Sequence, residues 1–383
     1  MRLVFVSHSF SPPDRPLANV GGMQRVAMDL DAAIQKIATN TAPGLKAKLT
    51  YDHIVLEASW KWVHILALPF LIKTYFQLSS LVRRREVDVI LFSSMVTAAL
   101  AVLLKRSMRV NGVRAAAIVH GQDVTKPVRA YQLFVPKIFK ALDLVLPVSG
   151  ATGKACVERG LPQEKVAVVH NGVKLDRFSP CQWPAGARAN HSFRSSLPPS
   201  ALLLVSVGRQ VKRKGFSWFV EQVMPHLPDH VHYWLGGDGP EGNAITEAIN
   251  SNQLQGRVKL LGRLGDAELT ELYQSADLFV MPNIPIPGDM EGFGIVMLEA
   301  AMNGLPTVAA RLEGIREVIT EGENGYFVES GNGSEYITRI SSLDSNRAEL
   351  ARLSTSSTAH VASTFGWEVV ARNYALSLSK MSK

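Results

Sequence analysis

The feature that most constrains the fold of this 383-residue chain is a repeated alternation of short apolar strands, loops and helices. Residues 2–10 (RLVFVSHSF) are typical of a buried strand, a Pro- and Gly-rich loop follows, and apolar residues recur at helical spacing over 23–38. Further strands are predicted in the first half of the chain at 87–94, 114–121, 143–149 and 165–173. Alternation of this kind predicts a parallel sheet with right-handed crossovers, in which ligands bind at the carboxyl ends of the strands.

A second series of the same kind begins at residue 201. Its strands are predicted at 201–209, 232–240, 257–264, 276–283 and 305–311. Between the two series the chain is rich in Pro, Ser and small residues, which is typical of a linker. The sequence therefore predicts an α/β fold with an N-terminal Rossmann-like domain at 1–185, a linker at 186–200, a C-terminal Rossmann-like domain at 201–365, and a last helix at 366–383.

The composition is that of a globular protein, with 46% apolar and 19% charged residues. The longest apolar runs end at Lys73 and Lys105, so we expect no segment that spans a membrane. The N-terminal stretch turns polar after Val6, unlike a signal peptide. Two cysteines, Cys156 and Cys181, make no disulfide framework, and a cytoplasmic location is expected.

Charge is distributed unevenly between the two halves. Residues 1–195 carry 26 Lys and Arg against 12 Asp and Glu, whereas residues 196–383 carry 15 against 21. A basic half indicates an anionic partner such as lipid headgroups, or serves only solubility and local ion pairs. Nucleic acid is not expected, because no binding motif accompanies the charge. Segment 59–85, with Trp60, Trp62 and Arg83–Arg85, suits the surface of an anionic membrane or a helix packed inside the domain.

A basic loop follows the first strand of the second series. The sequence GRQVKRKGF places Arg209 and Lys214 just beyond the carboxyl edge of the predicted sheet, with Lys212 and Arg213 between them. Such a cluster can neutralise a diphosphate, since Arg binds two oxygens at once and Lys acts as a point charge. A solvated basic turn is the alternative interpretation.

The sequence EGFGIVMLEA places two acids around the start of a predicted helix that runs from Gly294 to Gly304. Free amides and the helix dipole make such an N-terminus suitable for a phosphate. Glu291 lies before it and Glu299 lies inside the helix, so one could accept hydrogen bonds from a sugar and the other from a ribose. A structural cap or ion pair is the alternative role for Glu299.

His120 lies at the carboxyl end of the predicted strand 114–121, directly before Gly121. A histidine there is better placed to contact a ligand than one in the middle of a strand. The acids of the sequence Asp29-Leu30-Asp31 point to different faces of a helix, which predicts a solvated surface and no metal site. The chain has no zinc-ligand spacing, and 236–242 lacks the full dinucleotide fingerprint. No metal and no cofactor are therefore expected.

Together these motifs resemble the GT4-type retaining glycosyltransferases of the GT-B fold, over nearly the whole chain. The segments that carry the resemblance are VGGMQRV, HGQD, VVHNGVKLDRFSP, GRQVKRKG, GGDGP, EGFGIVMLEA, GLPTVAARLEGIREVI, ENGYFV and FGWEVVARNY. The resemblance implies two Rossmann-like domains whose parallel sheets face each other across a cleft, and a C-terminal helix that crosses back to the N-terminal domain.

The resemblance also implies roles for individual residues. Glu291 would bind hydroxyls of the donor sugar, Glu299 the ribose, and Arg209 with Lys214 the diphosphate. Gly22 would let the N-terminal loop approach the diphosphate, and His120 would lie at the sugar near the reacting centre. Backbone amides would contact phosphate or sugar at Phe293, Gly294 and Ile295. The base is expected near Gly236, Arg263 and Leu264.

The expected reaction is the metal-independent, retaining transfer of a hexose from a UDP- or GDP-sugar to a hydroxyl of a glycan or lipid-linked acceptor, in envelope or polysaccharide biosynthesis. It would take place in the cytoplasm or at the inner face of the cytoplasmic membrane, with the leaving phosphate as base. Two alternatives stay open, a nucleotide-sugar epimerase and a non-catalytic partner subunit that binds a nucleotide-sugar.

Overall fold

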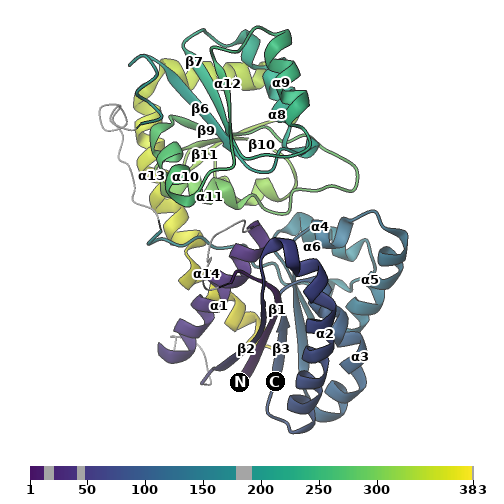
Figure 1. Ribbon diagram of the computed structural model, residues 1–383. Helices are drawn as coiled ribbons and strands as arrows, with labels where there is room; N and C mark the ends of the chain where they lie inside the picture. Colours follow the sequence, from purple (N-terminus) through teal and green to yellow (C-terminus); the bar gives the residue numbers. More distant parts are fainter. Residues whose placement is uncertain (13–20, 41–47, 178–191, 382–383) are drawn as a thin grey trace. The chain divides into compact units, whose positions relative to one another are not determined.

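The computed structural model describes residues 1–12, 21–40, 48–177 and 192–381 (Figure 1). The chain forms two compact units. Unit 1 consists of Met1–Gly172 together with Phe365–Lys383, and unit 2 consists of Val173–Thr364. The chain therefore leaves unit 1, completes unit 2 and then returns to unit 1.

Unit 1 is built on a parallel sheet with the strand order β2-β1-β3-β4-β5. The strands are β1 (Arg2–Phe10), β2 (Thr50–Glu57), β3 (Val89–Phe92), β4 (Arg114–Val119) and β5 (Leu144–Pro147). The helices are α1 (Gly22–Asn40), α2 (Trp60–Arg83), α3 (Met95–Asn111), α4 (Gln122–Thr125), α5 (Arg129–Ala141), α6 (Gly150–Val157), the 3-10 turn η1 (Gln163–Lys165) and α14 (Trp367–Ser379).

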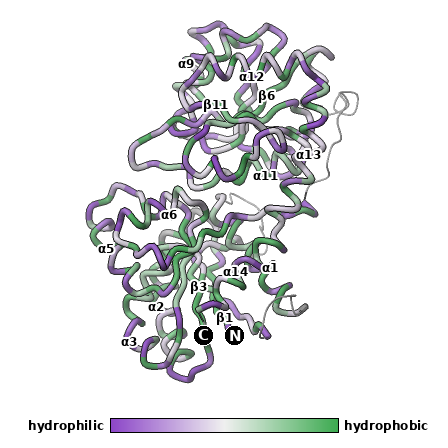
Figure 2. The backbone as a smooth tube through the Cα atoms, turned by 180° about the vertical axis from the view of Figure 1, so that it is seen from behind, coloured by the Kyte–Doolittle hydropathy of each residue, from purple (hydrophilic) through white to green (hydrophobic). Residues whose placement is uncertain are grey.

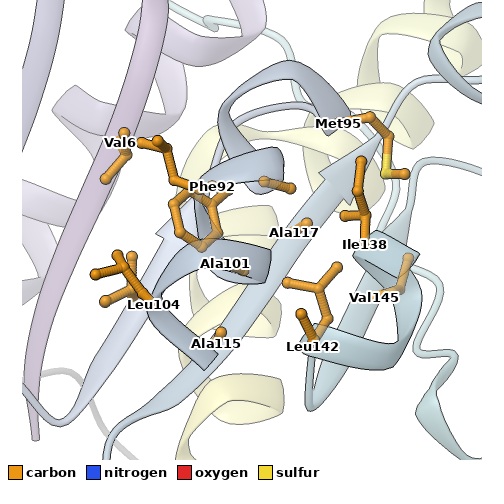
Figure 3. Close-up of a cluster of buried hydrophobic side chains, with 14 of the residues drawn as sticks. Val6, Phe92, Met95, Ala101, Leu104, Ala115, Ala117, Ile138, Leu142 and Val145 are labelled. Carbon is orange, nitrogen blue, oxygen red and sulfur yellow. The ribbon is translucent and has the colours of Figure 1, made fainter. Parts of the chain in front are cut away.

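The core of unit 1 lies between its sheet and the helices α2, α3 and α5. Val6 and Phe92 from the strands are fully buried there and meet Leu104 of α3, while Ile138 of α5 closes the far end (Figure 3). The central strands are apolar on both faces, as Figure 2 shows for β1 and β3, because helices cover both sides of the sheet. α1 and α14 pack against each other on the opposite side of the sheet (Figure 1).

Two expectations for unit 1 are wrong, and so is the run-length argument that was used against a membrane-spanning segment. The segment 165–173 forms no continuous strand: Val166 makes an isolated bridge to Val145, and the amides of Ala167 and Val169 donate to carbonyls of β5 at 3.0 Å. Asp31 is not solvated but 6% exposed, because it accepts hydrogen bonds from Tyr51 at 2.5 Å and from His53 at 2.7 Å. The stretch Ile65–Arg83 of α2 is long and apolar enough to cross a membrane by length and composition. A single lysine at position 73 does not end that apolar stretch.

Unit 2 is built on a second parallel sheet with the strand order β11-β10-β9-β6-β7-β8. The strands are β6 (Leu202–Val207), β7 (Val231–Gly236), β8 (Val258–Gly262), β9 (Leu278–Met281), β10 (Thr307–Ala310) and β11 (Gly325–Val328). The helices are η2 (Lys212–Lys214), α8 (Phe216–Gln222), η3 (Met224–His226), α9 (Gly242–Ser251), α10 (Asp266–Ser275), α11 (Ile295–Met302), η4 (Glu313–Glu317), α12 (Gly333–Ser345) and α13 (Arg347–Phe365).

The boundaries between the units differ from the predicted ones. Unit 2 begins at Val173 and not after a linker at 186–200, of which 186–191 lies outside the described residues. The physical reason is an ion pair that holds Arg194 in unit 2. Arg194 is only 5% exposed, and its Nη1 lies 2.6 Å from Oδ2 of the fully buried Asp277. This buried ion pair makes the segment part of unit 2, although its composition is that of a linker.

The last helix belongs to unit 1. The side chain of Trp367 covers Gly172 so closely that a Cβ on the glycine would lie 2.5 Å from the indole ring. Lys36 of α1 forms an exposed ion pair with Glu368 of α14. The C-terminal helix therefore returns to the N-terminal unit, as the GT-B resemblance implies.

Candidate functional site

The basic loop of unit 2 connects β6 to α8 and is held by backbone hydrogen bonds to the turn after β7. The amide of Gly208 donates to the carbonyl of Gly236 at 2.9 Å, and the amide of Gln210 donates to the carbonyl of Asp238 at 2.8 Å. Arg209 lies between these two bonds with an exposed side chain, whereas Lys214 is only 6% exposed. The two predicted phosphate-binding residues thus occupy different environments.

Lys214 contacts Glu291 directly. Its Nζ lies 2.7 Å from Glu291 Oε2, and the amide of Asn283 donates to the same oxygen at 3.1 Å. Arg213 Nε approaches that oxygen to 3.5 Å. Burial would raise the pKa of Glu291, but the positive charges of Lys214 and Arg213 outweigh it and hold this pKa below its ordinary value. Glu291 is therefore a carboxylate at neutral pH.

Glu313, which sequence reasoning missed, positions the loop that carries Glu291. Its Oε2 accepts a hydrogen bond from the Glu291 amide at 2.5 Å, and the next residue, Gly314, donates to the Glu291 carbonyl at 3.2 Å. Glu313 has φ of 45°, a left-handed conformation that is unfavourable for a residue with a side chain. Burial raises its pKa. The signal that could have found it is its place in the family segment GLPTVAARLEGIREVI, at the start of η4, which follows β10.

Helix α11 begins at Ile295, directly after Gly294 in a left-handed conformation with φ of 92°. Phe293, just before this turn, is buried. A helix leaves its first amides without a carbonyl of a preceding turn, and here the amide of Met297 donates to the carbonyl of Gly294 at 3.0 Å. Glu299 lies in the same helix and is 4% exposed. The helix start and both acids are therefore placed along the chain as predicted, with Glu291 in the loop and Glu299 inside the helix.

Glu299 has a partner that sequence reasoning did not assign. Nη1 of Arg177 lies 3.6 Å from Glu299 Oε1, and Nη2 of the same guanidinium lies 2.6 Å from Asp266 Oδ1. The hydroxyl of Tyr273 donates to Glu299 Oε2 at 3.5 Å. The structural ion pair considered for Glu299 is thus present. Arg177 stands in the family segment VVHNGVKLDRFSP, which was the available signal.

The residues predicted at the base lie beside the turn after β7. Leu264 packs over Gly236, with its Cδ1 3.2 Å from the position of a Cβ on that glycine. Arg263 Nε lies 2.7 Å from Asp238 Oδ2, and both side chains are exposed. Since Asp238 is bound through its carbonyl to Gln210, this turn and the basic loop form one connected surface of unit 2.

Gly22 and His120 are in unit 1. Gly22 is the first residue of α1 and is exposed, while most of the predicted glycine loop, 13–20, lies outside the described residues. The His120 amide donates to Asp123 Oδ1 at 2.8 Å, and its Nε2 lies 2.9 Å from the carbonyl oxygen of Ser93. Because a carbonyl only accepts, Nε2 carries the hydrogen. Burial raises the pKa of Asp123.

Unit 2 thus brings together a buried lysine, a carboxylate and a helix N-terminus, with an exposed arginine on the adjoining turn. Positive charges beside free helix amides bind phosphates, and the carboxylates accept hydrogen bonds from hydroxyls. Among the described residues, no group of three or more His, Cys, Asp or Glu could hold a metal ion.

Both units match known protein families. Residues 20–177 match the family described as "Glycosyltransferase Family 4", and residues 201–346 match "Glycosyl transferases group 1". Among the relatives are the putative colanic acid biosynthesis glycosyltransferase WcaL of Escherichia coli (28% identical over 270 residues) and a D-inositol 3-phosphate glycosyltransferase of Streptomyces bingchenggensis (31% over 224 residues). These alignments cover 68% and 55% of this chain, but only 63% and 47% of the relatives.

Solved structures share the fold over the whole chain. Anabaena Alr3699/HepE in complex with UDP-glucose has a TM-score of 0.72 at 19% identity, covering 99% of this chain and 100% of that one. The sucrose-phosphate synthase of Thermosynechococcus elongatus also has a TM-score of 0.72, at 17% identity, covering 100% and 99%. This likeness confirms the predicted GT-B architecture with two Rossmann-like domains.

Proposed function

The chain belongs to the GT4-type glycosyltransferases of the GT-B fold, and on this premise we propose that it moves a hexose from a UDP- or GDP-sugar to a hydroxyl of a glycan or lipid-linked acceptor. The observation that carries the proposal is the Lys214–Glu291 contact of 2.7 Å beside the start of α11. The WcaL relative is named as a putative glycosyltransferase of colanic acid biosynthesis, which supports a polysaccharide or envelope product.

The proposed donor site combines two kinds of contact. Lys214, Arg209 and the amides of Ile295 and its neighbours bind the diphosphate, because they supply positive charge at the place where the leaving group gains negative charge. Glu291 accepts hydrogen bonds from the sugar hydroxyls. These positive groups take the part that a metal ion has in other transferases, so the proposed reaction is metal-independent.

Glu299 is proposed to bind the ribose. Its Oε1 lies 3.6 Å from Nη1 of Arg177, so a positive charge stands beside a carboxylate that can accept further hydrogen bonds. The base is proposed to lie against Gly236, Arg263 and Leu264. The solved complex of Alr3699/HepE contains UDP-glucose, which makes a UDP-hexose the first donor to test.

The proposed chemistry is transfer with retention of the anomeric configuration. The acceptor hydroxyl attacks the anomeric carbon on the face from which the phosphate departs, and its proton passes to the leaving phosphate oxygen. The nucleoside diphosphate is released, and one glycosidic bond replaces the bond between sugar and phosphate. In unit 1, His120 and Gly22 keep the roles that the family resemblance implies, contact with the sugar and with the diphosphate. The proposed location is the cytoplasm, at the inner face of the membrane.

A thermal-shift panel with UDP, GDP, ADP and dTDP and their sugar conjugates, all with EDTA, tests the donor site. A ligand at about 100 times its dissociation constant stabilises the protein by about 2.7 kcal/mol. We expect one nucleotide to raise the melting temperature of the wild type, with a smaller rise for Glu299→Gln. No rise with any nucleotide would contradict the proposed site. The anomeric configuration of the product, read by NMR, tests retention, and a new sugar isomer from donor alone would instead support an epimerase.

A further inference from the structure

Three neighbouring helices of unit 1 carry positive charge and no negative charge. The sequences of α2, α3 and α5 contain nine Lys and Arg residues and no Asp or Glu. The helices on the other side of the sheet carry both signs, with Asp29 and Asp31 in α1 and Glu368 in α14. The asymmetry of charge is therefore concentrated on one side of unit 1, which is the side formed by α2, α3 and α5 (Figure 1).

The same three helices expose large apolar side chains. Of the sixteen such side chains exposed among the described residues, ten belong to these helices. They are Trp62, Ile65, Leu66, Leu68, Ile72 and Phe76 in α2, Val96, Leu103 and Val110 in α3, and Leu133 in α5. Their exposure runs from 40% to 77%. An exposed apolar patch of this extent marks an interaction surface more often than a solvated one.

Basic and apolar residues alternate along the outer side of each helix. Lys73 is exposed between Ile72 and Phe76, and Lys137 follows Leu133 by one turn. On α3, Arg106 lies between Leu103 and Val110 at helical spacing, and it is exposed as they are. We call the exposed side of α2, α3 and α5 the basic apolar face.

α2 cannot leave unit 1 to span a bilayer without emptying the core. Its inner side places Phe70, Leu78 and Val82 in the core beside Ile90 and Phe92, and Leu78 and Val82 are completely buried. Of the apolar stretch of α2, 28% is buried, and Leu71, Tyr75 and Leu81 are partly buried against the core. The exposed apolar side chains of the stretch face outward. A helix with one side fixed in a protein core and the other side apolar and basic is suited to lie along a membrane surface.

We propose that the basic apolar face is a docking surface for a lipid bilayer with anionic headgroups. Its cations match the headgroup charge, and its apolar side chains reach the acyl layer beneath, so a bilayer satisfies both halves of the surface at once. A second copy of the chain placed symmetrically on this face would bring like charges together, which is unfavourable. Nucleic acid would match the charge but leave the apolar side chains without a partner.

The test is co-sedimentation of the full chain with vesicles of phosphatidylcholine alone and with vesicles rich in phosphatidylglycerol, at low and high salt. We expect binding to the anionic vesicles only, and weaker binding at high salt because salt screens the headgroup charge. The variant Lys73→Gln/Lys105→Gln/Lys137→Gln should lower the partition coefficient on the order of a hundredfold, since each basic residue at such a surface contributes about fivefold. Its control, Lys48→Gln/Lys154→Gln/Arg316→Gln, loses three charges elsewhere.

The apolar half of the face is tested by Ile65→Ser/Ile72→Ser/Phe76→Ser, with Val168→Ser/Leu260→Ser/Val369→Ser as its control. Only the first variant should lose binding to the anionic vesicles. Equal loss in both apolar variants, or no binding by the wild type, would overturn the proposal. A different outcome in sedimentation is that the wild type and the control are dimers and that Ile65→Ser/Ile72→Ser/Phe76→Ser is a monomer. That result would also overturn the proposal and assign the basic apolar face to a second copy of the chain.

The proposal extends the proposed function, because a lipid-linked acceptor would lie in the bilayer to which the face binds. The two can fail separately. Vesicle binding is measured without donor or acceptor, and the thermal shift with nucleotides is measured without lipid. We expect the face variants to keep the nucleotide-induced shift of the wild type. A wild type that binds nucleotide but no anionic vesicle would refute the docking surface alone.

Discussion

Replacing Lys214 by methionine tests whether the buried ion pair between Lys214 and Glu291 stabilises the candidate site. Methionine keeps most of the aliphatic stem and removes the ammonium that lies 2.7 Å from Glu291 Oε2. The side chains of the pair are only 8% and 12% exposed, so the remaining carboxylate is left largely without solvent. Breaking a buried pair in this way costs about 3–5 kcal/mol. Because Arg213 and Asn283 still contact Glu291, we expect the lower end, about 3 kcal/mol.

The pH dependence of this loss follows from the pKa of Glu291, which the folded protein holds below the ordinary value of 4.5. A carboxyl group with a lowered pKa contributes stability that is fully present above its ordinary pKa and is lost as the pH falls through the folded pKa. In Lys214→Met the effect of burial is no longer opposed by the ammonium, so the pKa of Glu291 rises. The difference in stability between wild type and variant should therefore be greatest at neutral pH and shrink as the pH falls from the raised pKa of Glu291 in the variant to its lowered pKa in the wild type.

Urea unfolding of unit 2, followed at neutral pH and at pH values below the ordinary pKa of Glu291, measures the difference. A loss of about 3 kcal/mol corresponds to about 6–12 °C in melting temperature for a unit of this size. Arg209→Met is the matched control: its side chain is exposed, so it should change stability by less than about 0.5 kcal/mol while removing the same charge from the proposed diphosphate site. Equal stability of Lys214→Met and wild type at neutral pH, or a loss that does not change with pH, would refute the reasoning.

Three further predictions concern unit 2. Arg194→Met should lower its free energy of unfolding by about 3–5 kcal/mol in urea, since it leaves Asp277 buried without its ion pair; a loss below about 1 kcal/mol would contradict the pairing. Glu313→Ala should cost about 1–3 kcal/mol, because the Glu291 amide loses its acceptor, whereas Glu313→Gln keeps an acceptor and should lose less. Gly215→Ala should melt well below Gly262→Ala. Both glycines have φ near 66°, but only at position 215 would a Cβ meet a carbonyl oxygen, 2.0 Å away.

The two sheets could be predicted because buried parallel strands are continuous apolar runs, and most runs of this chain are followed by glycine turns. β2 escaped detection since Asp52 and His53 interrupt its apolar pattern at the edge of the sheet. Conversely, 165–173 has the composition of a strand and donates two backbone hydrogen bonds to β5, but its pairing with β5 is limited to an isolated bridge at Val166. Local composition cannot show whether a segment pairs with its neighbour along its whole length.

In the candidate site, sequence reasoning selected Lys214 and Glu291 but not the contact between them. Residue type and position along the strands predict which edge of the sheet a side chain reaches, and that was sufficient to choose both. Pairings between distant segments depend on how loops cross that edge. Glu313 and Arg177 were missed for this reason, since each acts on the acids through a loop from elsewhere in the chain. The burial of Arg194 escaped notice because its segment has the composition of a linker.

The return of the chain to unit 1 at Phe365 has a consequence for how the protein is made. On the ribosome, domains generally fold in the order in which they are synthesised. Here every residue of unit 2 is synthesised before α14, and α14 packs on α1 and covers Gly172 with Trp367. The unit that begins first is therefore completed last. A nascent chain released before Phe365 would carry all of unit 2 and an N-terminal unit with α1 uncovered on the side that α14 occupies, a state open to recognition by chaperones and proteases.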